Sequence, residues 1–139
     1  MFAVSRRRAF TLIELIAVIV ILAIISVVAV PKFFDHSTKA KEAACKGVVG
    51  AVRSAISNFY ANQAVNGSAR YPTLTEIQTS GTVLQDTVPV NPYNNSATIT
   101  AVSWTSSNPT SGAAGWNYDA TTGKFWANSN TSGVGENAF

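Results

Sequence analysis

Two side chains in this sequence could form a nucleophilic pair, the thiol of Cys45 and the imidazole of His36. A catalytic thiol needs a base within hydrogen-bond reach. The two residues lie nine positions apart in a segment that we expect to be helical, which separates them by about 13 Å of helix rise. They cannot pair within one chain, and the sequence contains no phosphate loop, nucleophile elbow or zinc-ligand spacing. We therefore expect no enzymatic activity, and we expect Cys45 to be a small buried side chain.

Acidic side chains could instead offer oxygen ligands to a calcium ion, and the candidates are Asp86, Asp119 and Glu136. A calcium site usually takes several such ligands from one region of a protein. The segment 126–139 contains one acidic residue, Glu136. We expect no cofactor and no metal, with calcium binding as the weaker alternative.

Glu14 is the residue whose position most needs an explanation, because it lies in the apolar run FTLIELIAVIVILAIISVVAV over residues 10–30. About 20 apolar residues in a helix span the core of a bilayer. A charged side chain at the centre of such a helix costs about 2.5–3.5 kcal/mol on insertion scales. The run therefore predicts a transmembrane helix, and Glu14 is a candidate functional residue. The alternative is an interfacial glutamate that extends to the lipid headgroups.

The apolar run follows three consecutive arginines, Arg6, Arg7 and Arg8, which favour a cytoplasmic amino terminus. They also account for the formal net charge of +3, because the other seven Lys and Arg residues balance seven Asp and Glu residues. This balance gives no indication of nucleic-acid binding. A secretory signal cleaved after Ala29 and a twin-arginine signal are alternatives. Against the secretory signal, the run exceeds the roughly 7–15 apolar residues that are usual for one.

The string Arg8-Ala9-Phe10-Thr11-Leu12-Ile13-Glu14-Leu15 resembles the processing signal of type IV prepilins and type II secretion pseudopilins. The resemblance implies cleavage between Ala9 and Phe10 by a prepilin peptidase, which then methylates the new amine of Phe10. Pro31 matches another landmark of this family. The sequence departs from the family in three places: Ala9 stands where Gly is most frequent, Ala51 stands where many type IV pilins have a second proline, and Cys45 is the only cysteine. A single cysteine excludes the intrachain disulfide that closes the carboxy-terminal loop of many type IV pilins.

The helix is predicted to continue beyond the membrane as an amphipathic segment over residues 31–63. Apolar residues recur there at spacings of three and four, among them Cys45, Val49, Val52 and Ile56. Pro31 removes a main-chain donor, so we expect a kink or local melting over residues 27–31. The apolar face needs a partner, which the remaining chain can supply.

Residues 64–139 are predicted to form a small head built on an antiparallel sheet. Thr73 and Glu76 fit a capping box at the start of a short helix that ends near Gly81. Residues 98–104 alternate as a strand does, and 115–118 and 124–127 flank a five-residue loop containing Gly123, as in a hairpin. We expect a core of aromatic side chains, and we expect the loops 91–97 and 106–114 to be exposed. The aromatic candidates are Trp104, Trp116, Tyr118, Phe125 and Trp126.

These observations predict an α+β protein with four parts: a leader (1–9), a transmembrane and assembly helix (10–30), an amphipathic helix (31–63) and a β-sheet head (64–139). The resemblance implies a subunit that polymerises into a type IV pilus or a similar filament. In that family, the residue that corresponds to Glu14 pairs with the terminal amine of a neighbouring subunit and so fixes the register.

The resemblance also implies where the chain acts and with what. The partners would be the prepilin peptidase, identical subunits, an assembly platform in the bacterial inner membrane, and lipid before assembly. The head would be periplasmic. Two alternatives stay open: a pseudopilin of a type II secretion system, whose major members carry a calcium site, and a monomeric binding domain tethered to the membrane.

Overall fold

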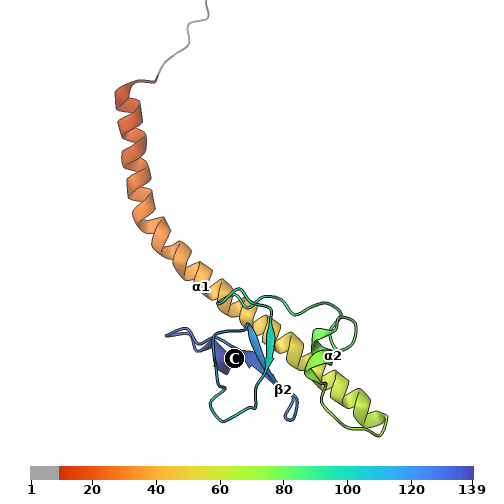
Figure 1. Ribbon diagram of the computed structural model, residues 1–139. Coiled ribbons are helices and arrows are strands. Elements are labelled where there is room, and N and C mark those ends of the chain that lie inside the picture. Colours follow the sequence, from red (N-terminus) through yellow and green to blue (C-terminus); the bar gives the residue numbers. More distant parts are fainter. Residues whose placement is uncertain (1–9) are drawn as a thin grey trace, which may run out of the picture. The chain divides into compact units, whose positions relative to one another are not determined.

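The computed structural model describes residues 10–139, so the leader, including Ala9, lies outside the described residues. The described chain divides into two compact units, one extending up to Thr38 and the other comprising Lys39–Phe139. Each unit is described by itself below. The element order is α1, α2, β1, β2, β3 and a final 3-10 helix, η1 (Figure 1).

Helix α1 (Leu12–Val65) contains 54 residues and supplies most of the first unit. Up to Val30 its residues are apolar except for Glu14 and Ser26, and nearly all of its residues in that unit are exposed. Pro31 lies inside α1, and the helix assignment continues through residues 27–31 without a break. The kink expected at Pro31 remains a prediction.

In the second unit, one face of α1 packs on a three-stranded sheet, and the α+β fold class is therefore confirmed (Figure 1). The helix contributes Cys45, Val49, Val52 and Ile56, which are at most 2% exposed. Their spacing of three and four residues places them on one side of the helix. From the sheet come Trp116, Tyr118 and Phe125, which are all completely buried. Trp104 was expected in the same core, but it is only half-buried, and the ammonium of Lys124 lies 3.1 Å from the centre of its ring.

The sheet is ordered β1 (Ile99–Ala101), β2 (Trp116–Asp119), β3 (Lys124–Ala127). Strands β2 and β3 form the expected antiparallel hairpin, with Trp116 opposite Ala127. The expectation of an entirely antiparallel sheet was wrong, because β1 pairs with β2 in parallel, with Ile99 opposite Trp116. Parallel neighbours need a crossover of about a dozen residues or more. The long segment 102–115 between the two strands supplies it.

The short helix α2 (Leu74–Gln78) begins with the predicted capping box. Thr73 Oγ1 accepts from the main-chain N–H of Glu76 at 3.3 Å, and the carboxylate of Glu76 accepts from the main-chain N–H of Thr73 at 2.7 Å. The helix ends at Gln78, and Gly81 follows in a left-handed conformation with φ of 83°. Ile77 is buried, so α2 covers part of the core.

The loops around the sheet are less exposed than their polar composition predicts. Asn91 is completely buried. Its side-chain amide is satisfied there, because it donates to Gly115 O at 2.8 Å and to Ser129 Oγ at 3.0 Å. Asn128, also buried, accepts from the main-chain N–H of Ser111 at 2.7 Å. The expectation that residues 91–97 and 106–114 are simply exposed was therefore wrong at Asn91 and at Ala114, which is 4% exposed.

Candidate functional site

Glu14 lies in the first turn of α1, where it closes a capping box with Thr11. The main-chain N–H and the Oγ1 hydroxyl of Thr11 both donate to Glu14 Oε2 at 2.8 Å. In return, the N–H of Glu14 donates to Thr11 Oγ1 at 3.3 Å. These bonds satisfy donors that the start of a helix otherwise leaves unpaired. The sequence analysis missed Thr11, although the Thr-x-x-Glu spacing that identifies Thr73 and Glu76 is also present here.

The second carboxylate oxygen of Glu14, Oε1, is unpaired in the part of the chain that the structure describes. Within residues 10–139, Oε1 of Glu14 has no hydrogen-bond partner, and the two ion pairs are Lys46–Glu42 and Arg70–Glu76. The capping box orients the carboxylate, and one oxygen is left to accept a bond from a cation. Charge-assisted bonds of this kind are about twice as strong as neutral ones.

Phe10, the residue that would follow the predicted cleavage, is 90% exposed. It precedes Glu14 by four positions, a rise of about 6 Å if both were in a helix. Ala9, on the other side of the predicted bond, lies outside the described residues. The amine that cleavage would create therefore belongs to a well-exposed part of the chain.

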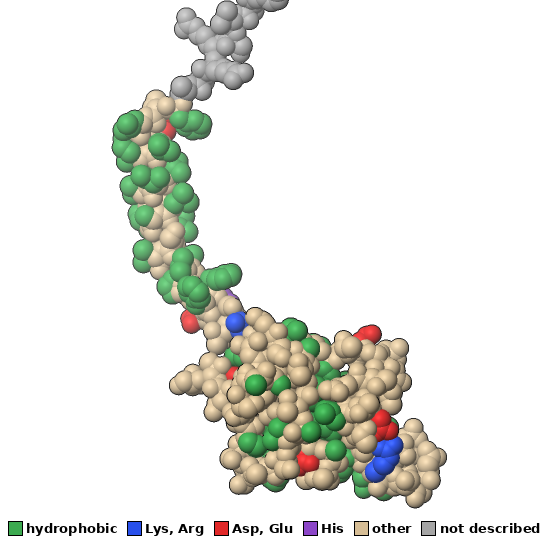
Figure 2. Space-filling view, in the orientation of Figure 1, with side chains coloured by type: hydrophobic (Ala, Val, Ile, Leu, Met, Phe, Trp, Pro, Cys, Tyr) green, Lys and Arg blue, Asp and Glu red, His purple; other side chains and the backbone are tan. Residues whose placement is uncertain are grey.

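The surface around Glu14 is almost entirely apolar. The large side chains from Leu12 to Phe34 are 42–75% exposed. Figure 2 shows green, apolar side chains distributed along the whole of this segment of α1. By length and composition, α1 is the one described helix that could cross a membrane. An apolar surface of this extent indicates burial in lipid or against other proteins.

Cys45, the cysteine of the second unit, does not have the properties of a catalytic thiol. Cys45 is completely buried, and desolvation, together with the charge of Glu136, raises the pKa of its thiol to about 11. The thiol is therefore protonated at neutral pH and is a packing residue, as expected. His36, the other member of the pair that was considered, lies in the first unit.

The three acidic residues considered for calcium are not brought together. Within residues 10–139, no group of three or more His, Cys, Asp or Glu side chains could hold a metal ion. Glu136 is completely buried, and its carboxylate accepts from the main-chain N–H of Thr131 at 2.9 Å and from Thr131 Oγ1 at 2.8 Å. Desolvation raises the pKa of Glu136, but hydrogen bonds from its own main-chain N–H and from Thr131 outweigh this effect and hold the pKa below the ordinary value. The carboxylate of Asp119 likewise accepts hydrogen bonds from the main-chain N–H groups of Thr121 and Trp104.

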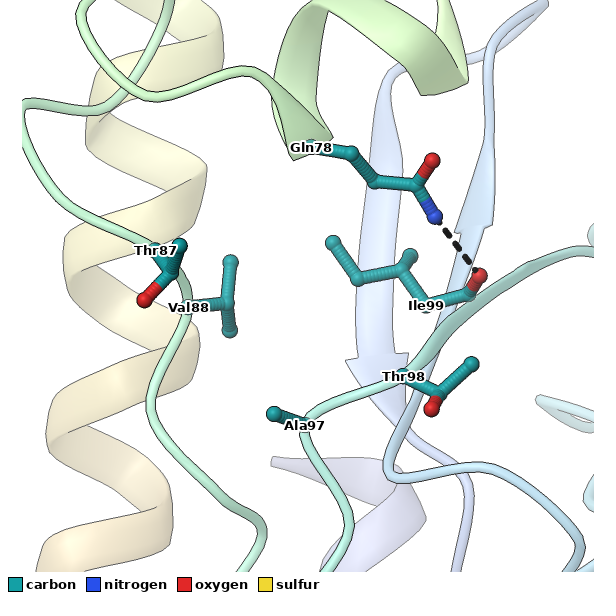
Figure 3. A pocket seen from close by; sticks show the side chains of 6 residues that line it. All are labelled: Gln78, Thr87, Val88, Ala97, Thr98 and Ile99. Atoms are coloured by element: carbon teal, nitrogen blue, oxygen red, sulfur yellow. Dashed lines mark hydrogen bonds between the residues drawn. The ribbon is translucent and has the colours of Figure 1, made fainter.

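A hollow of about 350 Å³ in the second unit lies beside the edge strand β1 (Figure 3). Its lining contains no titratable side chain. Gln78 extends from the end of α2, and its Nε2 donates to Ile99 O at 3.2 Å. At the opposite edge of the sheet, Arg53 Nε donates to Phe125 O at 2.9 Å. Side-chain donors thus occupy a carbonyl on each edge of the sheet, which disfavours edge-to-edge association of the heads.

Comparison with known families matches residues 4–30 to the prokaryotic N-terminal methylation motif. No curated protein and no solved structure matches the chain. The motif covers the arginines, the predicted cleavage bond, Glu14 and the apolar run, and leaves residues 31–139 unmatched. It implies processing by a prepilin peptidase and suggests membrane anchoring before assembly. The amino-terminal segment is therefore a prepilin-type signal, which is consistent with the type IV pilin and pseudopilin family and implies a structural subunit similar to a pilin or pseudopilin.

Proposed function

We propose that this chain is the subunit of a type IV pilus or pilus-like filament, formed after cleavage between Ala9 and Phe10 and methylation of Phe10. Before assembly, the apolar part of α1 lies in the inner membrane with the amino terminus in the cytoplasm and the head in the periplasm. During assembly, contacts with identical helices replace contacts with lipid. An assembly platform in the membrane carries out the transfer.

The observation that carries this proposal is the carboxylate of Glu14, which lies in an exposed apolar helix and whose Oε1 accepts no hydrogen bond from residues 10–139. In a polymer, the terminal amine of Phe10 from a neighbouring subunit supplies the missing cation. The capping box with Thr11 holds the acceptor in place, so less side-chain entropy is lost when the amine binds. Such a buried pair contributes register more than net stability.

A pseudopilin of a type II secretion system is the second candidate. The single cysteine favours it, because a disulfide-closed loop is impossible in this chain. The two candidates differ in the length and the location of the filament. Immunogold electron microscopy of intact cells and of spheroplasts would show long surface fibres for a pilus subunit and short filaments confined to the periplasm for a pseudopilin.

Processing is tested by mass spectrometry of the mature protein isolated from membranes. The proposal expects a chain that starts at Phe10 and carries a methyl group on its amine. A chain that starts at Val30 would show an ordinary secretory signal cleaved after Ala29, and the apolar segment would then be discarded before any assembly.

A further inference from the structure

The apolar part of α1 ends at side chains that suit the boundary between a membrane and water. No residue in the range 15–31 is charged, so Glu14 and Lys32 are the nearest charged residues on either side of it. Phe33 and Phe34 follow Lys32 directly and are 71% and 65% exposed. Their rings meet edge to face, with centroids 6.4 Å apart. The two rings therefore form one exposed aromatic pair at the outer end of the apolar part.

The spacing between the two ends matches the thickness of a bilayer. Phe34 follows Glu14 by 20 positions within α1, which corresponds to a rise of about 30 Å. The hydrocarbon core of a typical bilayer is also about 30 Å thick. When the rings lie at the outer boundary of this core, the carboxylate of Glu14 lies at the inner boundary. The aromatic pair and the charge can therefore each occupy an interface at the same time.

A shallower position, with residues 10–30 centred in the core, is less favourable. It moves the helix outward by the four positions that separate Phe10 from Glu14, or about 6 Å. Glu14 then lies inside the core, where a charged side chain is costly. The two rings move outward into the hydrated headgroup region at the same time. Aromatic side chains of a helix also lean towards its amino-terminal turn, here the apolar part, and this direction favours the deeper position.

The charged residues around the rings are compatible with the deeper position. Lys32 precedes Phe34 by two positions, about 3 Å of helix rise. Its long aliphatic chain lets the ammonium group reach the headgroup phosphates while the methylene groups stay in apolar surroundings. Asp35 and His36 follow the rings and are exposed. The helix thus changes from apolar to polar within about one turn on either side of the pair.

We propose that Phe33 and Phe34 bind the lipid interface of the periplasmic leaflet and, with Glu14 at the opposite interface, fix the depth of the unassembled subunit in the membrane. Lipid is the partner because the pair continues directly from the surface that the membrane covers. The inference rests on the membrane anchoring in the proposed function and adds a specific contact to it. Phe10 then lies about 6 Å beyond the inner boundary of the core, so the proposed cleavage bond is presented on the cytoplasmic side.

The depth of the helix can be measured with a nitroxide label on Val28→Cys in the full chain. Val28 is 62% exposed. Cys45 does not compete for the label, because it is completely buried and burial raises the pKa of its thiol. The labelled chain is reconstituted in vesicles of dioleoyl phosphatidylcholine and phosphatidylglycerol. Electron paramagnetic resonance with oxygen and a water-soluble nickel chelate as relaxation agents then gives the depth of the label.

Replacing both rings tests the lipid contact directly. Phe33→Ala combined with Phe34→Ala should move the label towards the vesicle surface by up to about 6 Å, the distance to the shallower position. Replacing both rings with Trp should leave the depth unchanged, because Trp also prefers the membrane interface. An unchanged depth in the Ala variant, or an equal shift in the Trp variant, would overturn the inference.

The matched control combines Ile24→Ala with Ile25→Ala. These two adjacent side chains are also exposed, at 66% and 56%, but they lie in the middle of the apolar part. They remain in the hydrocarbon core at either depth, so their loss should leave the label where it is. A shift equal to that of the ring variant would show that any loss of apolar surface moves the helix, and it would contradict a role for the rings.

Filament counts in cells separate lipid from a second copy of the chain as the partner of the rings. If the rings packed only against a neighbouring subunit, the Ala variant would keep its depth in vesicles and form at least tenfold fewer filaments. That result would contradict the lipid contact. The depth measurement needs no assembly machinery, so it is independent of polymerisation. If the wild-type chain forms no filaments but the label shifts as expected, the proposed filament is wrong and the lipid contact stands.

Discussion

The ring of Tyr71 lies directly against Gly123, so that a Cβ at position 123 would come within 2.4 Å of two ring atoms. Gly123 also has a φ of 70°, in the left-handed region, at the end of the loop between β2 and β3. Tyr71 also stacks on Tyr60 of α1, with ring centroids 4.7 Å apart. The glycine thus lets the hairpin, the segment before α2 and the helix pack together.

Gly123→Ala should destabilise the head strongly. A left-handed residue other than glycine costs about 1–2 kcal/mol, and forcing a methyl group against the ring of Tyr71 adds about 1–3 kcal/mol. The matched control is Gly112→Ala, because Gly112 has the same φ of 70° but open space at its Cβ. Urea unfolding of residues 35–139, which contain the whole second unit, should give a loss about twofold larger for Gly123→Ala. Equal losses would show that backbone conformation alone matters at position 123.

Calcium removal should leave the head unchanged, because hydrogen bonds from Thr131 occupy the carboxylate of Glu136. We expect the same melting temperature for residues 35–139 in EDTA and in millimolar calcium chloride. Glu136→Ala, in contrast, should cost about 1–3 kcal/mol, because the N–H and hydroxyl of Thr131 lose their acceptor. A melting temperature that falls by several degrees in EDTA would instead indicate a calcium-bound head.

Acid should weaken the head through carboxylates whose pKa is lowered by folding. The side chain of Arg70 and the N–H of Thr73 lower the pKa of Glu76 to about 2, from an ordinary value of 4.5. A lowered pKa in the folded state means that the stabilisation is fully present above pH 4.5 and is lost as the pH falls from 4.5 towards 2. Folding also lowers the pKa values of Asp119 and Glu136, so their contributions to stability are likewise lost as the pH falls.

The measurement is the melting temperature of residues 35–139 as a function of pH. We expect a plateau between about pH 5 and 7 and a steep decline below it. Glu76→Gln should make that decline shallower, since one of the contributing carboxylates is removed. A decline of unchanged steepness in this variant would mean that Glu76 does not contribute.

Local patterns in the sequence predicted the features that depend on local chemistry. The capping box of Thr73 and Glu76, the buried helix face with Cys45 and Val49, and the hairpin around Gly123 each follow from residues close together in sequence. The capping box at Thr11 and Glu14 was equally predictable from its spacing, but the carboxylate was interpreted as a charge in an apolar run and as the partner of a neighbouring amine, and not as a helix cap.

Features that depend on distant residues could not be predicted in this way. Alternation identifies residues 99–101 as a strand but carries no information about direction, which depends on how the long segment 102–115 returns to the sheet. The burial of the loop residue Asn91 could not be predicted, because its hydrogen-bond partners, Gly115 and Ser129, are far away in sequence. A groove of about 320 Å³ that Gly47 and Ala51 line likewise depends on where the segment 84–89 packs against α1.

The central claim is that Glu14 serves assembly, and Glu14→Val tests it most directly. The change removes a charge from the apolar run, so the subunit should remain in the membrane as well as before. Cleavage should persist, because the bond between Ala9 and Phe10 is unchanged. In the filament, the amine of a neighbouring Phe10 would be buried without its partner, at a cost of about 3–5 kcal/mol per subunit.

Thr11→Val is the control for the capping box, because it removes the hydroxyl that bonds to Glu14 Oε2 but keeps the carboxylate. Filaments are counted by electron microscopy and subunits by membrane fractionation in the same cells. The account predicts processed subunits at normal levels in both variants, filaments from Thr11→Val, and none from Glu14→Val. Abundant normal filaments from Glu14→Val would contradict it.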